Sequence, residues 1–237
     1  MIIFFTFALK NRLFNRMKTK KMHKEGTATL LIYGAIVVIA GLILFVTSAP
    51  TVIWLAVMVP LLIVYGVTIN FFRYPPRTFH GDELHDVIAP SDGTIVTIEE
   101  VLEPDYFKDR RIQVSIFMSV TNVHAQWCPL NGDVIKSIHE DGRFKKAWLP
   151  KASNENERST IVIKSDAGPV ILMRQVAGAV ARRIVTYLET GDRSEINGEL
   201  GFIKFGSRID LYLPLDANIQ VKMGDKVRGN TTTIAKI

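Results

Sequence analysis

Three short segments of the sequence contain residue types that could act together in catalysis. Asp92-Gly93 places a carboxylate in a turn, His124 supplies an imidazole that titrates near neutrality, and Gly206-Ser207 joins a hydroxyl to an unhindered glycine carbonyl. A serine hydroxyl is a weak nucleophile that needs an adjacent base, and a carboxylate can orient a histidine for that role. The three segments could therefore support attack by a serine on a carbonyl carbon.

Each segment also has an ordinary structural explanation. Asp-Gly is a common hairpin turn, Gly-Ser is a common strand end, and a single histidine in an apolar stretch is usually structural. His124 and Cys128 could imitate a pair of metal ligands, but no second pair with ligand spacing follows, so we expect no metal site. Taken singly, none of these segments assigns a function.

The segments occur with others in a particular order, which is more specific than any of them alone. The chain contains, in sequence, Pro90-Ser91-Asp92-Gly93, Asn122-Val123-His124, Asn156-Glu157-Arg158, Gln175-Val176-Ala177-Gly178, Ala181-Arg182-Arg183-Ile184 and Phe205-Gly206-Ser207-Arg208. From about Phe71 to Leu213 this order resembles the short bacterial and archaeal type of phosphatidylserine decarboxylase. Two positions depart from that pattern: Ala89-Pro90-Ser91 replaces Ser-Pro-Ala, and Trp127 stands where many relatives have a basic residue.

The resemblance implies an inactive proenzyme that cleaves itself between Gly206 and Ser207. The serine hydroxyl would attack the preceding carbonyl to give an ester, and elimination followed by hydrolysis would release ammonia. The products would be a large subunit, residues 1–206, and a small subunit, residues 207–237. The small subunit would begin with a covalent pyruvoyl group derived from Ser207, an electron sink for converting phosphatidylserine to phosphatidylethanolamine and carbon dioxide.

The resemblance also suggests roles for individual side chains. His124 is the expected base for cleavage and the expected proton donor after decarboxylation, and Asp92 could orient it. Whether Asp92 and His124 divide the two reactions between them stays open, and Glu157 is worth testing. Four basic residues are candidates for binding the phosphodiester, without a choice among them: Arg182, Arg183, Lys204 and Arg208.

The first part of the chain predicts a membrane anchor. Residues 1–26 are a basic segment, and residues 27–72 hold two uncharged apolar runs, Thr27–Thr47 and Thr51–Phe72, separated by Ser48-Ala49-Pro50. Each run has the length needed to cross a bilayer, so we expect a transmembrane hairpin. Positive charges flank the hairpin at both ends and are missing from its turn. The rest of the chain is therefore expected on the cytoplasmic side of the cell membrane.

Residues 73–237 predict a β-rich (α+β) sandwich of short strands. Val-, Ile- and Thr-rich runs lie between Gly-containing turns, and Ala177–Leu188 has the apolar spacing of a helix. Gly191-Asp192 and Gly224-Asp225 resemble the turns of lipoyl-like domains. The strand predictions cover Thr94–Val101, Arg111–Met118, Thr160–Lys164, Val170–Gln175, Leu200–Phe205, Arg208–Leu213 and Ile219–Lys222.

The composition limits the kinds of binding partner that we expect. The formal charge is +6, which favours an acidic partner, and the apolar runs favour an anionic membrane over nucleic acid. The expected partners are phosphatidylserine, that membrane, and the two subunits of one proenzyme, with a homo-oligomer left open. The main alternative is a non-enzymatic, membrane-anchored lipoyl-like adaptor. A zinc peptidase would need several His and Asp ligands that the sequence does not offer.

Overall fold

A computed structural model describes residues 21–142, 157–178, 183–204 and 207–237. The chain divides into two compact units with the boundary between Pro76 and Arg77. That boundary falls four residues after the one expected from composition, because the polar linker up to Pro76 belongs with the helices. Each unit is described below by itself.

The first unit contains a helical hairpin. The strand β1 (Lys21–Met22) and the single-turn helix η1 (Lys24–Gly26) precede α2 (Thr27–Val46) and α3 (Thr51–Phe71), and β2 (Arg73–Tyr74) pairs with β1. Both long helices are long and apolar enough to cross a membrane, and most of their large apolar side chains are exposed. These properties are consistent with membrane association and confirm the two predicted helices.

Small residues bring the two helices close together. A β-carbon placed on Gly34 of α2 would lie 3.2 Å from the Tyr65 hydroxyl of α3, and one on Gly41 would lie 3.8 Å from Met58. Close approach at glycine is typical of helix pairs in lipid, where packing replaces the hydrophobic effect as the source of association. The hairpin turn at Ser48 adopts a positive φ of 48°.

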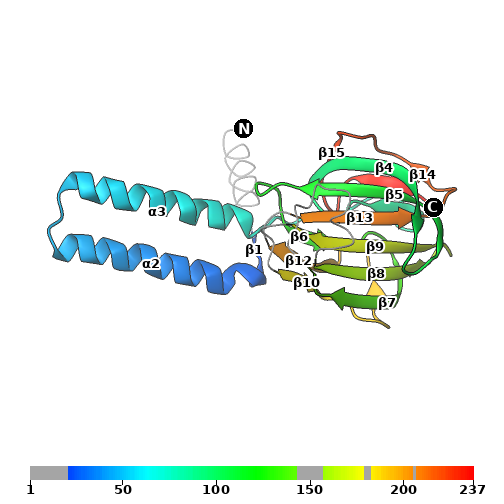
Figure 1. Ribbon diagram of the computed structural model, residues 1–237, viewed down its shortest axis with the longest axis horizontal. Helices are drawn as coiled ribbons and strands as arrows, with labels where there is room; N and C mark the ends of the chain where they lie inside the picture. Colours follow the sequence, from blue (N-terminus) through cyan, green and yellow to red (C-terminus); the bar gives the residue numbers. More distant parts are fainter. Residues whose placement is uncertain (1–20, 143–156, 179–182, 205–206) are drawn as a thin grey trace, which may run out of the picture. The chain divides into compact units, whose positions relative to one another are not determined.

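The second unit is built from antiparallel β-structure (Figure 1). Within the described residues, eight strands form one curled sheet in the order β11-β7-β8-β9-β13-β5-β4-β15, and two smaller sheets have the orders β10-β12-β6 and β14-β16-β3. The bounds of the strands are β3 (Asp86–Ile88), β4 (Gly93–Glu103), β5 (Asp109–Met118), β6 (Ala125–Trp127), β7 (Gly132–Glu140), β8 (Arg158–Ser165), β9 (Val170–Ala177), β10 (Arg183–Thr186), β11 (Arg193–Ser194), β12 (Glu199–Lys204), β13 (Ser207–Leu213), β14 (Asn218–Ile219), β15 (Lys226–Val227) and β16 (Thr233–Lys236).

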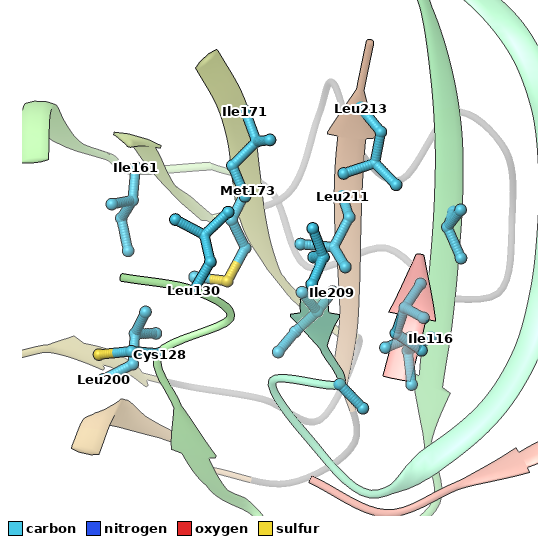
Figure 2. Packing of buried hydrophobic residues seen from close by; sticks show 14 of the residues in the cluster. Ile116, Cys128, Leu130, Ile161, Ile171, Met173, Leu200, Ile209, Leu211 and Leu213 are labelled. Carbon is cyan, nitrogen blue, oxygen red and sulfur yellow. The ribbon is translucent and has the colours of Figure 1, made fainter. Parts of the chain in front are cut away.

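One face of the large sheet makes the main hydrophobic core. Alternate residues of β13, namely Ile209, Leu211 and Leu213, point into it together with Ile116 of β5 and Met173 of β9 (Figure 2). These five side chains are fully buried, and burying one such side chain stabilises a fold by roughly 1.5–3 kcal/mol. The alternation places Ser207, two positions before Ile209, on this same core-facing side.

The helix expected over Ala177–Leu188 is wrong. Its first residue ends β9, and Arg183–Thr186 is the strand β10, which pairs with β12. Two short strands with buried residues at their ends imitate helical spacing when they are read as one segment. The sequence also missed β7, because the run GDVIKSIHE alternates buried and charged residues without a strong apolar signal.

Candidate functional site

Ser207 lies at the beginning of a central strand. In β13 it stands opposite Met118 of β5 on one side and Ala177 of β9 on the other. Its side chain is fully buried, and its hydroxyl has no hydrogen-bond partner among the residues that the structure describes. Buried hydroxyls are normally satisfied, so an unsatisfied one at this position suggests a reactive role rather than a structural one.

Two flanking contacts place His124 at the same end of the sheet as Ser207. It follows Met118, the cross-strand partner of Ser207, after a turn in which the Asn122 amide donates to the Ser119 carbonyl. It also precedes Ala125, which pairs with Phe202 of β12, and the two rings of His124 and Phe202 lie 6.3 Å apart. The side chain is fully buried, and its Nδ1 lies 3.0 Å from the Asn122 carbonyl oxygen. That contact fixes the orientation of the imidazole ring.

Asp92 is bound to a residue that sequence reasoning did not single out as functional. Both carboxylate oxygens accept hydrogen bonds from the Arg77 guanidinium, and the Gly229 amide donates to Oδ1 at 2.9 Å. Arg77 also donates to the Gly229 carbonyl at 2.9 Å and lies 5.1 Å from the Trp127 ring. The side chains of Arg77 and Asp92 are only 8% and 12% exposed, so this is a nearly buried, bidentate ion pair.

A chain of neutral polar side chains runs across the core-facing side of the sheet. The Gln175 amide nitrogen donates to Gln126 Oε1, the Thr186 hydroxyl donates to Gln175 Oε1 at 2.6 Å, and the hydroxyls of Thr186 and Ser159 lie 2.9 Å apart. Gln126, Gln175 and Ser159 are buried. This network fixes the orientation of both amides, because each glutamine oxygen accepts a hydrogen bond within it and the Gln175 nitrogen donates one.

A cavity of about 600 Å³ opens beside this network. Its lining includes Thr186, Arg183 and Glu157, and His139 lies 3.4 Å from the Glu157 carboxylate. The Glu157 side chain accepts a hydrogen bond from the Ile184 amide at 3.1 Å, and its carbonyl accepts one from Ala177, the neighbour of Ser207. Glu157 therefore joins the beginning of β8 to the strands on which the candidate site is built.

The basic candidates for phosphate binding have different environments. Arg208 is buried and paired with buried Asp210, with 2.8 Å between Nε and Oδ1. Arg183 is exposed and lies directly opposite Lys204 in the β10–β12 pair. Arg182 and Gly206 lie outside the described residues. Cys128 is buried, and burial raises the pKa of its thiol, which disfavours a thiolate nucleophile there.

Comparison with known proteins agrees with the order of these segments. The family model described as phosphatidylserine decarboxylase matches residues 64–235. The chain belongs to the phosphatidylserine decarboxylase family. It is therefore a decarboxylase by family, and the adaptor alternative is displaced, since the match covers most of the second unit and the end of α3.

Individual relatives of this family match over nearly their whole length. A Phocaeicola vulgatus protein named phosphatidylserine decarboxylase proenzyme is 48% identical over 227 residues, which cover 96% of this chain and 99% of the relative. Proteins of the same name from Bacteroides fragilis and Cytophaga hutchinsonii are 50% and 42% identical, over 94% and 91% of this chain and 97% and 98% of theirs. No solved structure matches the chain, so the lipoyl-like character of its turns stays a prediction.

The structure brings together Ser207 and His124 at one end of the sheet and adds two features that sequence reasoning missed. Arg77 stands in a polar linker and looked like part of the positive flank of the hairpin, although its guanidinium is buried on Asp92. Gln126 and Gln175 lie 49 residues apart and meet only through the fold. The one available signal was that Gln126 and Gln175 both fall within or beside segments that carry the family resemblance.

Proposed function

We propose that this chain decarboxylates phosphatidylserine to phosphatidylethanolamine, after cleaving itself between Gly206 and Ser207. The family and the names of its relatives, which are proenzymes, support the reaction class and maturation. The observation that carries the proposal for this chain is the buried Ser207 hydroxyl, which has no partner among the described residues and begins a central strand. Such a hydroxyl is not committed to the fold.

In the proposed cleavage, Ser207 Oγ forms a bond to the carbonyl carbon of Gly206 while its proton passes to His124. The peptide C–N bond then breaks, and the nitrogen takes up a proton, which leaves an ester. Elimination releases the carboxylate of Gly206, and hydrolysis of the resulting enamine consumes one water and releases ammonia. The small subunit, residues 207–237, then begins with a pyruvoyl group, which supplies an electron sink for loss of carbon dioxide.

The other side chains have supporting roles in this proposal. His124 returns a proton to the product after carbon dioxide leaves, and the Arg77–Asp92 pair fixes the turn behind it. Arg183 and Lys204 are the proposed binders of the phosphodiester, since they are cross-strand neighbours in the β10–β12 pair and bring two positive charges together. Arg208 is a weaker candidate because Asp210 already neutralises it.

Intact mass of the purified protein under denaturing conditions tests the proposal, with Ser207→Ala as the control. The expected wild-type result is two fragments, the smaller holding 31 of 237 residues and so roughly 3.5 of the 26.6 kDa. Their summed mass should show the gain of one water and the loss of one ammonia. Plain hydrolysis would add water and lose no ammonia. An uncut wild-type chain in a folded preparation would refute the mechanism.

We further propose that the second unit lies on the cytoplasmic side of the membrane. The hairpin turn, Thr47 to Pro50, is uncharged, whereas basic residues flank both helices. Cys128 is the only cysteine and is buried, so Ser48→Cys introduces a single accessible thiol. A membrane-impermeant maleimide should label this variant in intact cells. Labelling only after the cells are broken would reverse the orientation.

A further inference from the structure

One buried donor of the candidate site has no assigned task. Gln126 is fully buried, and its Oε1 accepts from the Gln175 amide. Its Nε2 has no hydrogen-bond acceptor within the part of the chain that the structure describes. An amide nitrogen left unsatisfied in a dry interior costs stability, so such a group calls for an explanation.

The register of the sheet places Gln175, which holds the Gln126 amide, near Ser207. Ala177 is opposite Ser207 and Gln175 is opposite Ile209, so the Gln175 side chain lies diagonally across from Ser207 on the same face. Diagonal neighbours in an antiparallel pair are separated by roughly 7–8 Å, a distance that long side chains span. Gln126 contacts the end of the Gln175 side chain, and it follows His124 by two positions.

The network leaves the Gln126 amide little freedom to turn. Gln175 donates to it through nitrogen and accepts from Thr186 through oxygen, and Thr186 is supported in turn by Ser159. The Gln126 oxygen is thereby directed at Gln175 and its nitrogen away from it. A neutral, buried donor held in this way is the arrangement that stabilises negative charge as it develops on an oxygen.

We propose that Gln126 Nε2 donates a hydrogen bond to the carbonyl oxygen of the scissile peptide while that oxygen carries negative charge. This inference rests on the proposed self-cleavage at Ser207. When Oγ bonds to the carbonyl carbon, the π electron pair moves to the carbonyl oxygen, and the Oγ proton goes to His124. The charged oxygen is two bonds from the Ser207 nitrogen, and Gln175, which holds Gln126, lies diagonally across from Ser207. Gln126 is then a catalytic residue of maturation, and Gln175 is its positioning residue.

The test follows the rate of fragment formation by mass in the full-length chain. Gln126→Met keeps the side-chain length and removes the donor, and it should slow cleavage about 10²–10³-fold, the usual effect of losing one such donor. Gln175→Met should slow cleavage by a smaller factor, because Gln126 keeps its donor but loses its support. Gln113→Met is the matched control: Gln113 bonds to Ser115 and stands opposite Tyr212, on the other face of the sheet.

Hydroxylamine separates this role from a structural one. It cuts an ester that has already formed, so the uncut Gln126→Met chain should resist it, because the first step is what has failed. Wild-type rates in Gln126→Met, or cutting of that variant by hydroxylamine, would overturn the proposal. If Gln126→Met does not fold, Gln175→Met and Thr186→Val decide the matter by the same assay. A wild-type chain that never cleaves would instead remove the proposed function.

Discussion

Two turns of the β unit have the same backbone arrangement but different side-chain chemistry. The Asp92 turn, residues 90–93, leads into β4, which pairs with β15. The Asn131 turn, residues 129–132, leads into β7, which pairs with β11. In the first, Asp92 Oδ1 accepts from the Gly229 amide at 2.9 Å, and in the second, Asn131 Oδ1 accepts from the Ile196 amide at 2.7 Å. Each of the two strands also donates a matching backbone hydrogen bond, from the Ile95 amide to the Asp225 carbonyl and from the Val134 amide to the Asp192 carbonyl.

The difference between the turns is charge. Asn131 fulfils the structural task with a neutral amide, whereas Asp92 carries a carboxylate that both nitrogens of the Arg77 fork contact. Since the fold forms the same turn without a charge, the ion pair at Asp92 is not required by the backbone. We propose that it serves the reaction at Ser207 instead. The following predictions test that interpretation, from the largest expected effect to the smallest.

Asp92→Asn makes the first turn resemble the second. If the charge serves the reaction, we expect cleavage at Gly206–Ser207 to slow by about 10²–10⁴-fold, the usual contribution of acid–base machinery. The turn itself should persist, since an amide oxygen can still accept from Gly229. Mass spectrometry over time measures cleavage, and circular dichroism checks the fold. Asn131→Asp is the control and should mature normally; equal rates in wild type and Asp92→Asn would show that the charge is not used.

Arg77→Gln removes one partner of the pair and leaves the other charge nearly buried. Breaking a buried pair in this way should lower the free energy of unfolding by about 3–5 kcal/mol. The double variant Arg77→Gln/Asp92→Asn should recover much of that loss, because no unpaired charge remains. Urea titration of the detergent-solubilised Ser207→Ala background measures both. Additive effects of the two substitutions would mean that the pair is not energetically coupled.

Asn131→Ala deletes the acceptor in the neutral turn. The Ile196 amide would lose its partner, and we expect a cost of about 1–3 kcal/mol with no change in cleavage rate. Thermal unfolding in the same detergent measures the cost. A loss of cleavage as large as that of Asp92→Asn would contradict the separation of the two turns into a structural one and a catalytic one.

Gly191→Ala and Gly224→Ala test whether the turns before β11 and β15, the partner strands of β7 and β4, have equivalent backbones. The φ angles are 98° and 88°, and an added β-carbon meets nothing within 4 Å at either position. The cost is therefore conformational, about 1–2 kcal/mol, and should be the same for both substitutions. Unequal losses in unfolding midpoint would show that the likeness between the turns does not extend to their energetics.

The sequence predicted those parts of the structure that depend on local pattern. Uncharged apolar runs of membrane-spanning length predicted α2 and α3, and Val- and Ile-rich runs predicted β4, β5, β8, β9 and β13. The helix over Ala177–Leu188 failed because β10 is stabilised by pairing with β12, which apolar spacing does not reveal. Tertiary pairing decides between helix and strand in short segments of this kind.

The candidate site was predictable only where residue type is distinctive. Ser207 and His124 could be singled out because few residues serve as nucleophile and base, and the order of motifs identified them. Arg77, Gln126 and Gln175 could not, because arginine and glutamine have many ordinary uses. The roles proposed for them depend on contacts between distant parts of the sequence. Arg77 contacts Asp92, 15 residues away, and Gln126 contacts Gln175, 49 residues away.

The central place of β13 in the sheet has a consequence for how the cleaved protein could refold. The proposed small subunit contributes β13 between β5 and β9, β15 beside β4, and β16 beside β3, so its strands are interleaved with those of the large one. Before cleavage, refolding is a unimolecular event, but afterwards the same contacts would have to form between two molecules. Maturation would thus turn a reversibly folding chain into one whose recovery from unfolding depends on concentration. The cut would make folding a process that each molecule completes once.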